Sequence, residues 1–381
     1  MIRLGLCCIF RKAPINFANT TATAIGKMKR SDALVKQGGL CMANAEALLA
    51  ALHFCAENGI GCFRVNSQIL PLKTHQQVGY RMDELPHGKA IVRRFKECGT
   101  FAKQHRLRTS FHPDQFVVLN SQRPEVVEAS LRELEYQAEV AMWIGADVIN
   151  IHGGGAFGDK QKALADFARN LKRLSRRARS RLTVENDDKT YAPADLLPVC
   201  RATGIPLVYD VHHHRCHSDG LSVEEATEHA IATWNREPLF HVSSPLGGWK
   251  GPRPARHHDF IDVKDFPKCW HDLDLTVEVE AKAKEVAVLK LKKQLAERWF
   301  VYILRCRDGS LYTGIAKDVD RRLGQHKAGT ASRYTRSRLP VFLEYQEGHP
   351  TQSTALKREA VIKAMPRQKK ELLVGSGRSS Q

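Results

Sequence analysis

The chain has 381 residues, and 59 lysine and arginine residues against 41 aspartate and glutamate residues give it a formal net charge of +18. Its length corresponds to about two domains, or to one large barrel with an appended module. The apolar content of 43% excludes a disordered basic tail. A basic surface concentrates polyanions, so the charge favours nucleic acid over a membrane as the partner; a charge that serves solubility alone is the alternative.

The first 297 residues alternate short β-branched runs with longer helical patterns. The runs are IRLGLCC (2–8), GCFRV (61–65), RLRTSF (106–111), DVINI (147–151), RLTVE (181–185), PLVYD (206–210), LFHVS (239–243) and LTVEVE (275–280). Eight strands, each followed by a helix or a long connection, predict an α/β fold, a (β/α)₈ TIM barrel. The lysine-rich helical pattern AKAKEVAVLKLKKQLAER is expected to be the last helix of this domain.

Residues 298–372 form a second, smaller and more basic region, with 16 basic against 7 acidic residues. The stretch WFVYILRCRDGSLYTG predicts a hairpin with an Asp-Gly turn. The helix DVDRRLGQH follows and places Arg322 and His326 four residues apart on one face. A later helix, TALKREAVIKAM, carries Glu359. Residues 373–381 are rich in glycine and serine and are predicted to be a disordered tail.

Two features of the composition bear on the environment of the protein. No stretch approaches the roughly 18 apolar residues of a membrane span, and the apolar start MIRLGLCCIF lacks a signal-peptide cleavage site. The ten cysteines include no C-x-x-C pair and several lie in apolar runs, which predicts buried reduced thiols. We expect a cytoplasmic protein without a membrane partner, a monomer, associated with the nucleoid if the source is bacterial.

Histidines and carboxylates stand at the ends of six predicted strands. They are His112, His152, Glu185, Asp210 with His213 just beyond it, His241 and Glu280. The carboxyl ends of barrel strands meet at one rim, where such barrels place their chemistry. A single histidine is more often an ordinary hydrogen-bonded polar residue, but six strand ends together predict a site for two or three divalent ions, Mn²⁺ or Zn²⁺.

Motifs along the first domain resemble those of the UV damage endonuclease family, whose barrel is related to endonuclease IV and the xylose isomerases. The motifs are PINFANTTAT, RTSFHPDQFVVLNS, INIHGGGAFGDK, RLTVENDD, PLVYDVHHHRC, HVSSP, HHDFID and VEVEAKAKE. The resemblance implies that His112 and His152 bind one ion and that Glu185 bridges to a second. Asp210, His241 and Glu280 would complete that second site, and His213 and His258 would hold a third ion, although His257 could align in place of His258.

The same resemblance implies residues that meet the DNA. His75, in PLKTH, corresponds to an active-site histidine of the family, and Gln115 and Phe116 correspond to residues that enter the double helix beside a lesion. An aromatic side chain can fill the gap left by unstacked bases. The alternative is that Phe116 begins the apolar run FVVL and belongs to the core. Leu239 departs from relatives that carry a lysine near the metals.

The second region resembles the GIY-YIG nuclease superfamily in its small URI-type branch, with signature triplets that read VYI and YTG. The resemblance implies that Tyr302 and Tyr312 assist proton transfer and that Arg322 steadies the scissile phosphate. His326 would act with Tyr302 as a base, and Glu359 would hold a single Mg²⁺. The alternative is an inactive module that holds DNA, since only one carboxylate is present.

Together these features predict a metal-dependent DNA repair endonuclease that acts on double-stranded DNA. We expect it to nick the phosphodiester 5′ to UV photoproducts and other helix-distorting lesions, with the second domain cutting or anchoring the DNA. An abasic-site endonuclease on the same metal plan is the nearest alternative. A metal-dependent sugar isomerase and a non-catalytic DNA-binding scaffold are more distant ones.

Overall fold

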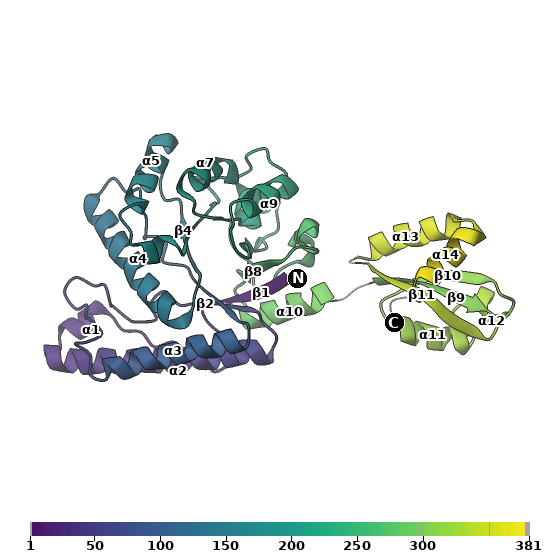
Figure 1. Ribbon diagram of the computed structural model, residues 1–381, viewed down its shortest axis with the longest axis horizontal. Coiled ribbons are helices and arrows are strands. Elements are labelled where there is room, and N and C mark those ends of the chain that lie inside the picture. Colours follow the sequence, from purple (N-terminus) through teal and green to yellow (C-terminus); the bar gives the residue numbers. More distant parts are fainter. Residues whose placement is uncertain (1, 297–298, 350, 378–381) are drawn as a thin grey trace. The chain divides into compact units, whose positions relative to one another are not determined.

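The computed structural model describes residues 2–296, 299–349 and 351–377. The chain forms two compact units, Met1–Leu291 and Lys292–Gln381, which we call the barrel unit and the small unit (Figure 1). We predicted the division at residue 297, directly after the last barrel helix. That helix is α10 (Glu285–Ala296), and residue 297 lies outside the described residues, so the exact boundary stays a prediction.

Eight parallel strands form the sheet of the barrel unit, in the order β6-β5-β4-β3-β2-β1-β8-β7. A bridge between Asp210 and His241 joins the two edge strands, and the His241 amide donates to the Tyr209 carbonyl at 3.0 Å. The predicted barrel and its eight strands are therefore confirmed. The strands are β1 (Ile2–Cys7), β2 (Cys62–Val65), β3 (Arg108–Phe111), β4 (Val148–His152), β5 (Leu182–Glu185), β6 (Leu207–Val208), β7 (Leu239–Val242) and β8 (Leu275–Val279).

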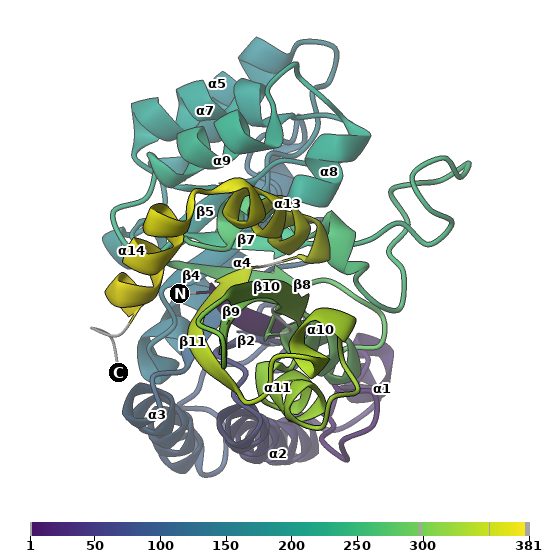
Figure 2. The same cartoon turned by 90° about the vertical axis from the view of Figure 1, so that its right-hand side faces the viewer.

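Helices cover the outside of the barrel, as the connections between parallel strands require. Figure 2 shows α2 and α3 on one side of the strands and α5, α7 and α9 on the other. The helices are α1 (Ala22–Gly26), α2 (Arg30–Glu57), α3 (Gly88–Gln104), α4 (Pro124–Ile144), α5 (Lys160–Leu171), α6 (Arg176–Arg179), α7 (Pro193–Thr203), α8 (Val211–Cys216) and α9 (Val223–Ile231), with 3₁₀ turns at Val263–Asp265 and Lys268–Trp270. Local sequence sets their ends: α4 begins at a proline and ends at Gly145, whose φ of 75° suits glycine.

Helix α2 corrects one expectation, because by length and composition it is apolar enough to cross a membrane. In the fold, however, its apolar side chains pack into the barrel unit. Cys41, Ala45, Leu48 and Leu52 are fully buried, as on the inner face of an outer barrel helix. All ten cysteines are free, and the expected burial holds for seven of them, since Cys8, Cys216 and Cys269 are only half-buried.

The small unit is a three-stranded antiparallel sheet, in the order β10-β9-β11, with helices on both faces. Alternate residues of β9 point to opposite faces: Tyr302 and Leu304 pack with Val319 of α11, and Val301 and Ile303 pack with Ala355 of α13. The elements are β9 (Trp299–Cys306), β10 (Leu311–Ala316), α11 (Val319–Lys327), α12 (Arg333–Arg336), β11 (Val341–His349), α13 (Gln352–Ala364) and α14 (Arg367–Gly377).

The predicted disordered tail begins too early. Helix α14 continues to Gly377, and Val374 is buried in the cluster that α13 forms with β9. Leu373 and Val374 give the last turns of α14 an apolar side to bury. This burial outweighs the low helix propensity of the glycines that follow. Residues 378–381 lie outside the described residues.

Candidate active sites

Strand register brings the predicted metal ligands of the barrel together. His152 at the end of β4 pairs with Glu185 at the end of β5, and Asp210 forms its bridge with His241 of β7. His112 directly follows β3 and Glu280 directly follows β8. Because all these strands are parallel, their last residues reach the same rim.

Glu185 is the centre of this cluster. Its two carboxylate oxygens lie 3.0 Å from His112 Nε2 and 3.0 Å from His241 Nδ1, and His213 Nδ1 lies 3.5 Å away. Burial opposes ionisation of Glu185, but the imidazoles of His241 and His152 outweigh it and hold the pKa of this carboxyl well below its usual range. A buried carboxylate that is kept ionised among histidines is a strong cation ligand.

The donor set fits divalent ions. Three groups of side chains have ligand atoms within 4.8 Å of one another: His112 with His152 and Glu185; His112 with His241 and Glu280; and Glu185 with Asp210 and His213. Two of their buried atoms, Asp210 Oδ2 and His152 Nδ1, have no hydrogen-bond partner. Leaving such atoms unpaired is costly, and a cation would satisfy them.

Sequence reasoning did not identify the charged pair beneath this cluster, Arg64 and Glu278. The buried Arg64 guanidinium binds Glu278, donates to Glu280 at 2.7 Å and lies 2.9 Å from His241 Nε2. Burial raises the pKa of Glu278, but Arg64 and His241 outweigh it and bring this pKa to about 2. The alternation of LTVEVE was the available signal, because it places Glu278 and Glu280 on the same inward face.

The structure distinguishes the two adjacent histidines at 257 and 258. His257 Nδ1 lies 3.7 Å from Glu280 Oε2, and its ring lies against those of His212 and His213. His258 turns its Nδ1 to the backbone of Phe260, and neither of the two histidines belongs to the three ligand groups. The contact with Glu280 therefore brings His257, and not His258, to the edge of the cluster.

The histidines beside His213 have separate environments. His214 contacts the Tyr209 hydroxyl and Asp219, away from the cluster. His212 is fully buried against Trp249 and His257, and neither of its ring nitrogens has a partner.

The residues expected to meet DNA lie outside the ligand cluster. Phe116 is 75% exposed, so the alternative that it belongs to the core is wrong, and Gln115 beside it is also exposed. His75 is exposed, its Nδ1 accepts from the Gln77 amide, and it belongs to none of the ligand groups. Leu239 packs with Val148 and Val208, so that position holds an apolar core side chain.

In the small unit, two tyrosines and a histidine form a second candidate site. The Tyr302 hydroxyl lies 3.0 Å from His326 Nε2, and the ring centroids of Tyr312 and His326 are 5.0 Å apart. Gly314 is the last residue of the signature YTG. A Cβ at this position would lie 2.6 Å from the Tyr302 hydroxyl, closer than van der Waals contact allows, so a side chain there would displace the tyrosine. Burial and the nearby Arg322 charge lower the pKa of His326 to about 4, so the ring is neutral and able to accept a proton.

The other two predicted residues of this site lie around it. Arg322 donates to Gln325 and to the Ala331 carbonyl, and its charge opposes the effect of burial on the pKa of Tyr302, which is raised. Glu359 on α13 is half-buried, and one of its oxygens lies 2.9 Å from the Lys363 ammonium. Glu359 belongs to none of the three ligand groups.

The barrel unit carries histidines and carboxylates at its rim, and the small unit carries a tyrosine–histidine pair on its sheet, so each unit holds a candidate hydrolytic centre. The family model for the UV-endonuclease UvdE matches residues 2–303, and the model for the GIY-YIG catalytic domain matches residues 298–371. The chain therefore belongs to the UV-endonuclease UvdE family and carries a GIY-YIG domain at its C-terminal end. It is an endodeoxyribonuclease, which rules out the sugar isomerase and the non-catalytic scaffold.

Individual relatives agree with this assignment. The chain is 35% identical over 288 residues to a UV DNA damage endonuclease of Bacillus velezensis, a match that covers 72% of this chain and 86% of the relative. The crystal structure of SacUVDE matches with a TM-score of 0.70 and 27% identity, over 78% of this chain and 99% of that one. Endonuclease IV from Thermus thermophilus shares the fold, with a TM-score of 0.51 and 16% identity over 76% of this chain and 96% of that one.

Proposed function

We propose that the barrel unit nicks double-stranded DNA at the phosphodiester 5′ to UV photoproducts and other helix-distorting lesions. The observation that carries this proposal is the position of Glu185, whose carboxylate contacts His112 just after β3, His213 on α8 and His241 on β7. The family to which the chain belongs supports the choice of UV damage over other substrates. The protein would act as a monomer in the cytoplasm, in association with the nucleoid if the source is bacterial.

Metal dependence is part of the proposal. His112, His152, Glu185, Asp210, His213, His241 and Glu280 would hold two or three ions, Mn²⁺ or Zn²⁺, with His257 as a further ligand. Ions bound there supply the charge that phosphodiester hydrolysis needs on its oxygens. The protein's own contribution is to fix most of these side chains at the carboxyl ends of six barrel strands and to bury Glu185 among histidines.

Lesion recognition would depend on how readily the duplex deforms. Gln115 and Phe116 are exposed on the loop that follows the candidate ligand His112. In the sequence, the aromatic side chain of Phe116 is therefore only four residues from a candidate metal ligand. Unstacking costs least at damaged steps, and a ring that replaces the lost stacking favours those steps. Recognition would then depend on distortion of the DNA and not on its base sequence.

The small unit would make a second incision or anchor the DNA. Tyr302 would pass a proton to the neutral His326, Tyr312 would assist, and Arg322 would contact the phosphate. Glu359 would hold one Mg²⁺ once it leaves its ion pair with Lys363. The hydrogen bond between Tyr302 and His326 supports this assignment.

Glu185→Gln tests the proposal for the barrel. The amide keeps the size of the side chain but removes the negative charge at the centre of the cluster, so we expect nicking of UV-irradiated plasmid to fall at least about a hundredfold. Glu128→Gln is the matched control, because Glu128 is exposed and its ion pair is with Arg173, on the outside of the barrel. Undiminished nicking by Glu185→Gln in a chain that also carries Tyr302→Phe would refute the proposal.

The lesion assignment needs defined substrates. Duplexes with one pyrimidine dimer, one abasic analogue or no lesion, labelled at the 5′ end, report both the preference and the position of the cut. We expect a nick directly 5′ to the dimer. Preference for the abasic duplex would support the abasic-site alternative.

A further inference from the structure

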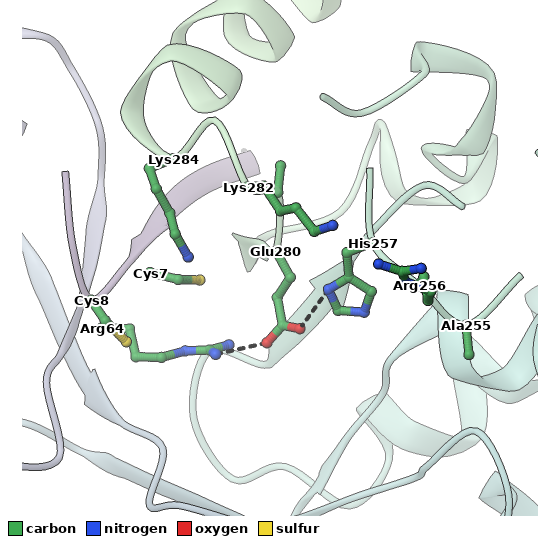
Figure 3. A pocket seen from close by; sticks show the side chains of 10 residues that line it. Cys7, Cys8, Arg64, Ala255, Arg256, His257, Glu280, Lys282 and Lys284 are labelled. Atoms are coloured by element: carbon green, nitrogen blue, oxygen red, sulfur yellow. Dashed lines mark ion pairs between the residues drawn. The ribbon is translucent and has the colours of Figure 1, made fainter. Parts of the chain in front are cut away.

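A basic pocket lies directly beside the ligand cluster of the barrel unit (Figure 3). Glu280 and His257 form one side of it, and Arg64 forms its floor through the ion pair with Glu280. Three more cations line the pocket: Arg256, Lys282 and Lys284.

These three cations are left without acidic partners. Arg64 is occupied by Glu278 and Glu280, whereas no described carboxylate lies within ion-pair distance of Arg256, Lys282 or Lys284. The pocket therefore has an excess of positive charge next to the candidate metal site. Such a concave basic surface attracts phosphate.

The backbone that carries the lysines is held in a fixed and strained form. The Lys282 amide donates to the His258 carbonyl at 3.1 Å, and the Ala283 amide donates to the Asp259 carbonyl at 3.0 Å. Lys284 has a φ of 52°, in the left-handed region that glycine or asparagine would adopt at lower cost.

A second strained residue lines the same pocket. Cys8 has a φ of 65°, and its amide donates to the Arg64 carbonyl at 3.0 Å. Backbone strain of this kind persists where the surrounding structure imposes it and is concentrated at ligand-binding sites. Two of the described non-glycine residues with a positive φ, Cys8 and Lys284, therefore line one pocket.

We propose that this pocket binds a phosphodiester group of the DNA backbone that flanks the scissile bond, clamped by Arg256, Lys282 and Lys284. This rests on the proposed function, because the flanking phosphate is defined by a cut at the neighbouring metal cluster. The contacts are to the backbone only, so the pocket fixes the register of the strand without reading its sequence.

The test measures DNA binding by the full chain as a function of salt, with an undamaged 30-base-pair duplex and no added metal. Each lost phosphate contact should reduce the slope of log K against log salt concentration by about 0.9. Because the three cations hold one phosphodiester, we expect the full decrease in a chain that carries Arg256→Gln, Lys282→Gln and Lys284→Gln together and a smaller one in each single variant, with affinity at about 0.1 M salt weakened several-fold. Lys103→Gln is the matched control, since Lys103 is exposed in the last turn of α3, which leads into the opposite end of the barrel strands.

Lys284→Gly separates a role in binding from a role in folding. Glycine relieves the strained φ, so thermal stability should rise or stay unchanged while DNA binding weakens as in Lys284→Gln. An unchanged slope in the triple glutamine variant would overturn the inference. Because the assay needs no cleavage, that result would leave the proposed nicking intact, and loss of nicking in Glu185→Gln would leave the slopes unchanged.

Discussion

The Arg64 guanidinium lies 2.7 Å from the Glu280 carboxylate, directly beneath the ligand cluster of the barrel. Arg64 also binds the buried Glu278 and reaches His241, so one buried cation holds two carboxylates and contacts two of the candidate ligands, Glu280 and His241. The arrangement places a permanent positive charge under a site that is expected to take divalent ions. Arg64 therefore fixes Glu280 in position before any ion binds.

Removing this guanidinium should destabilise the barrel strongly. Arg64→Leu leaves the buried Glu278 with His241 and Ser110 and the half-buried Glu280 with His241 and His257, and breaking a buried ion pair in this way costs about 3–5 kcal/mol of unfolding free energy. Urea denaturation of the metal-free protein measures the loss. Added Mn²⁺ should recover part of it, because the ion would replace the missing charge.

The control for Arg64 is an arginine with two exposed acidic partners. Arg94 pairs with Glu46 and Glu97 on the outer helices, and Arg94→Leu should cost less than about 1 kcal/mol. Equal losses for the two variants would mean that the pair beneath the cluster contributes no more than a surface ion pair.

Strand ends were the part of the site that the sequence could predict. His112, His152 and Glu185 each close an apolar run, and parallel strands must bring such residues to one rim. The choice between His257 and His258 could not be made in this way, because adjacent residues on a loop differ only in the direction of their side chains. That direction depends on the path of the loop around Glu280 and Phe260.

Two other features needed the folded structure. Arg64 lies in the short run GCFRV, whose apolar residues give no sign that the arginine points into the barrel. Its contact with Glu278, visible only in the folded structure, explains how this buried charge is tolerated. The apolar run FVVL is equally consistent with a buried and an exposed Phe116. The turns of the loop before α4 decide that Phe116 is exposed.

An exposed aromatic residue can be removed without harm to the fold, which makes Phe116 a clean test of lesion recognition. Phe116→Ala should change the unfolding free energy by no more than about 0.5 kcal/mol. Lost stacking of about 1–3 kcal/mol should lower the preference for dimer-containing over intact duplex roughly tenfold, measured by fluorescence anisotropy. Met142→Ala, an exposed residue near the far end of α4, should leave the preference unchanged.

The lowered pKa of His326, about 4, predicts how the small unit responds to acid. The unfolded chain takes up this proton near pH 6.5, well above the folded unit, so stability is complete above pH 6.5 and declines as the pH falls towards 4. Thermal unfolding of wild type and His326→Gln from pH 4 to 8 measures the effect, and the slope below pH 6.5 should be shallower in the variant. Protonation of the ring near pH 6.5, seen by NMR titration, would contradict the prediction.

Thr335 should set which nitrogen of His326 carries the proton. The Thr335 hydroxyl lies 2.7 Å from His326 Nδ1 and also donates to the Ser332 carbonyl at 3.3 Å. Since the hydroxyl has one proton, it accepts from Nδ1–H, which leaves the lone pair of Nε2 directed at the Tyr302 hydroxyl, 3.0 Å away.

Thr335→Val keeps the shape of this side chain but removes the acceptor for Nδ1–H. In a Glu185→Gln background, which isolates the small unit, we expect kcat for DNA cleavage to fall at least about tenfold while KM stays unchanged, because the wrong tautomer cannot accept the Tyr302 proton. Thr335→Ser restores the hydroxyl and should restore the rate. Nitrogen-15 NMR of His326 reports the tautomer directly: an Nδ1–H ring in wild type that persists in Thr335→Val would show that Thr335 does not control it.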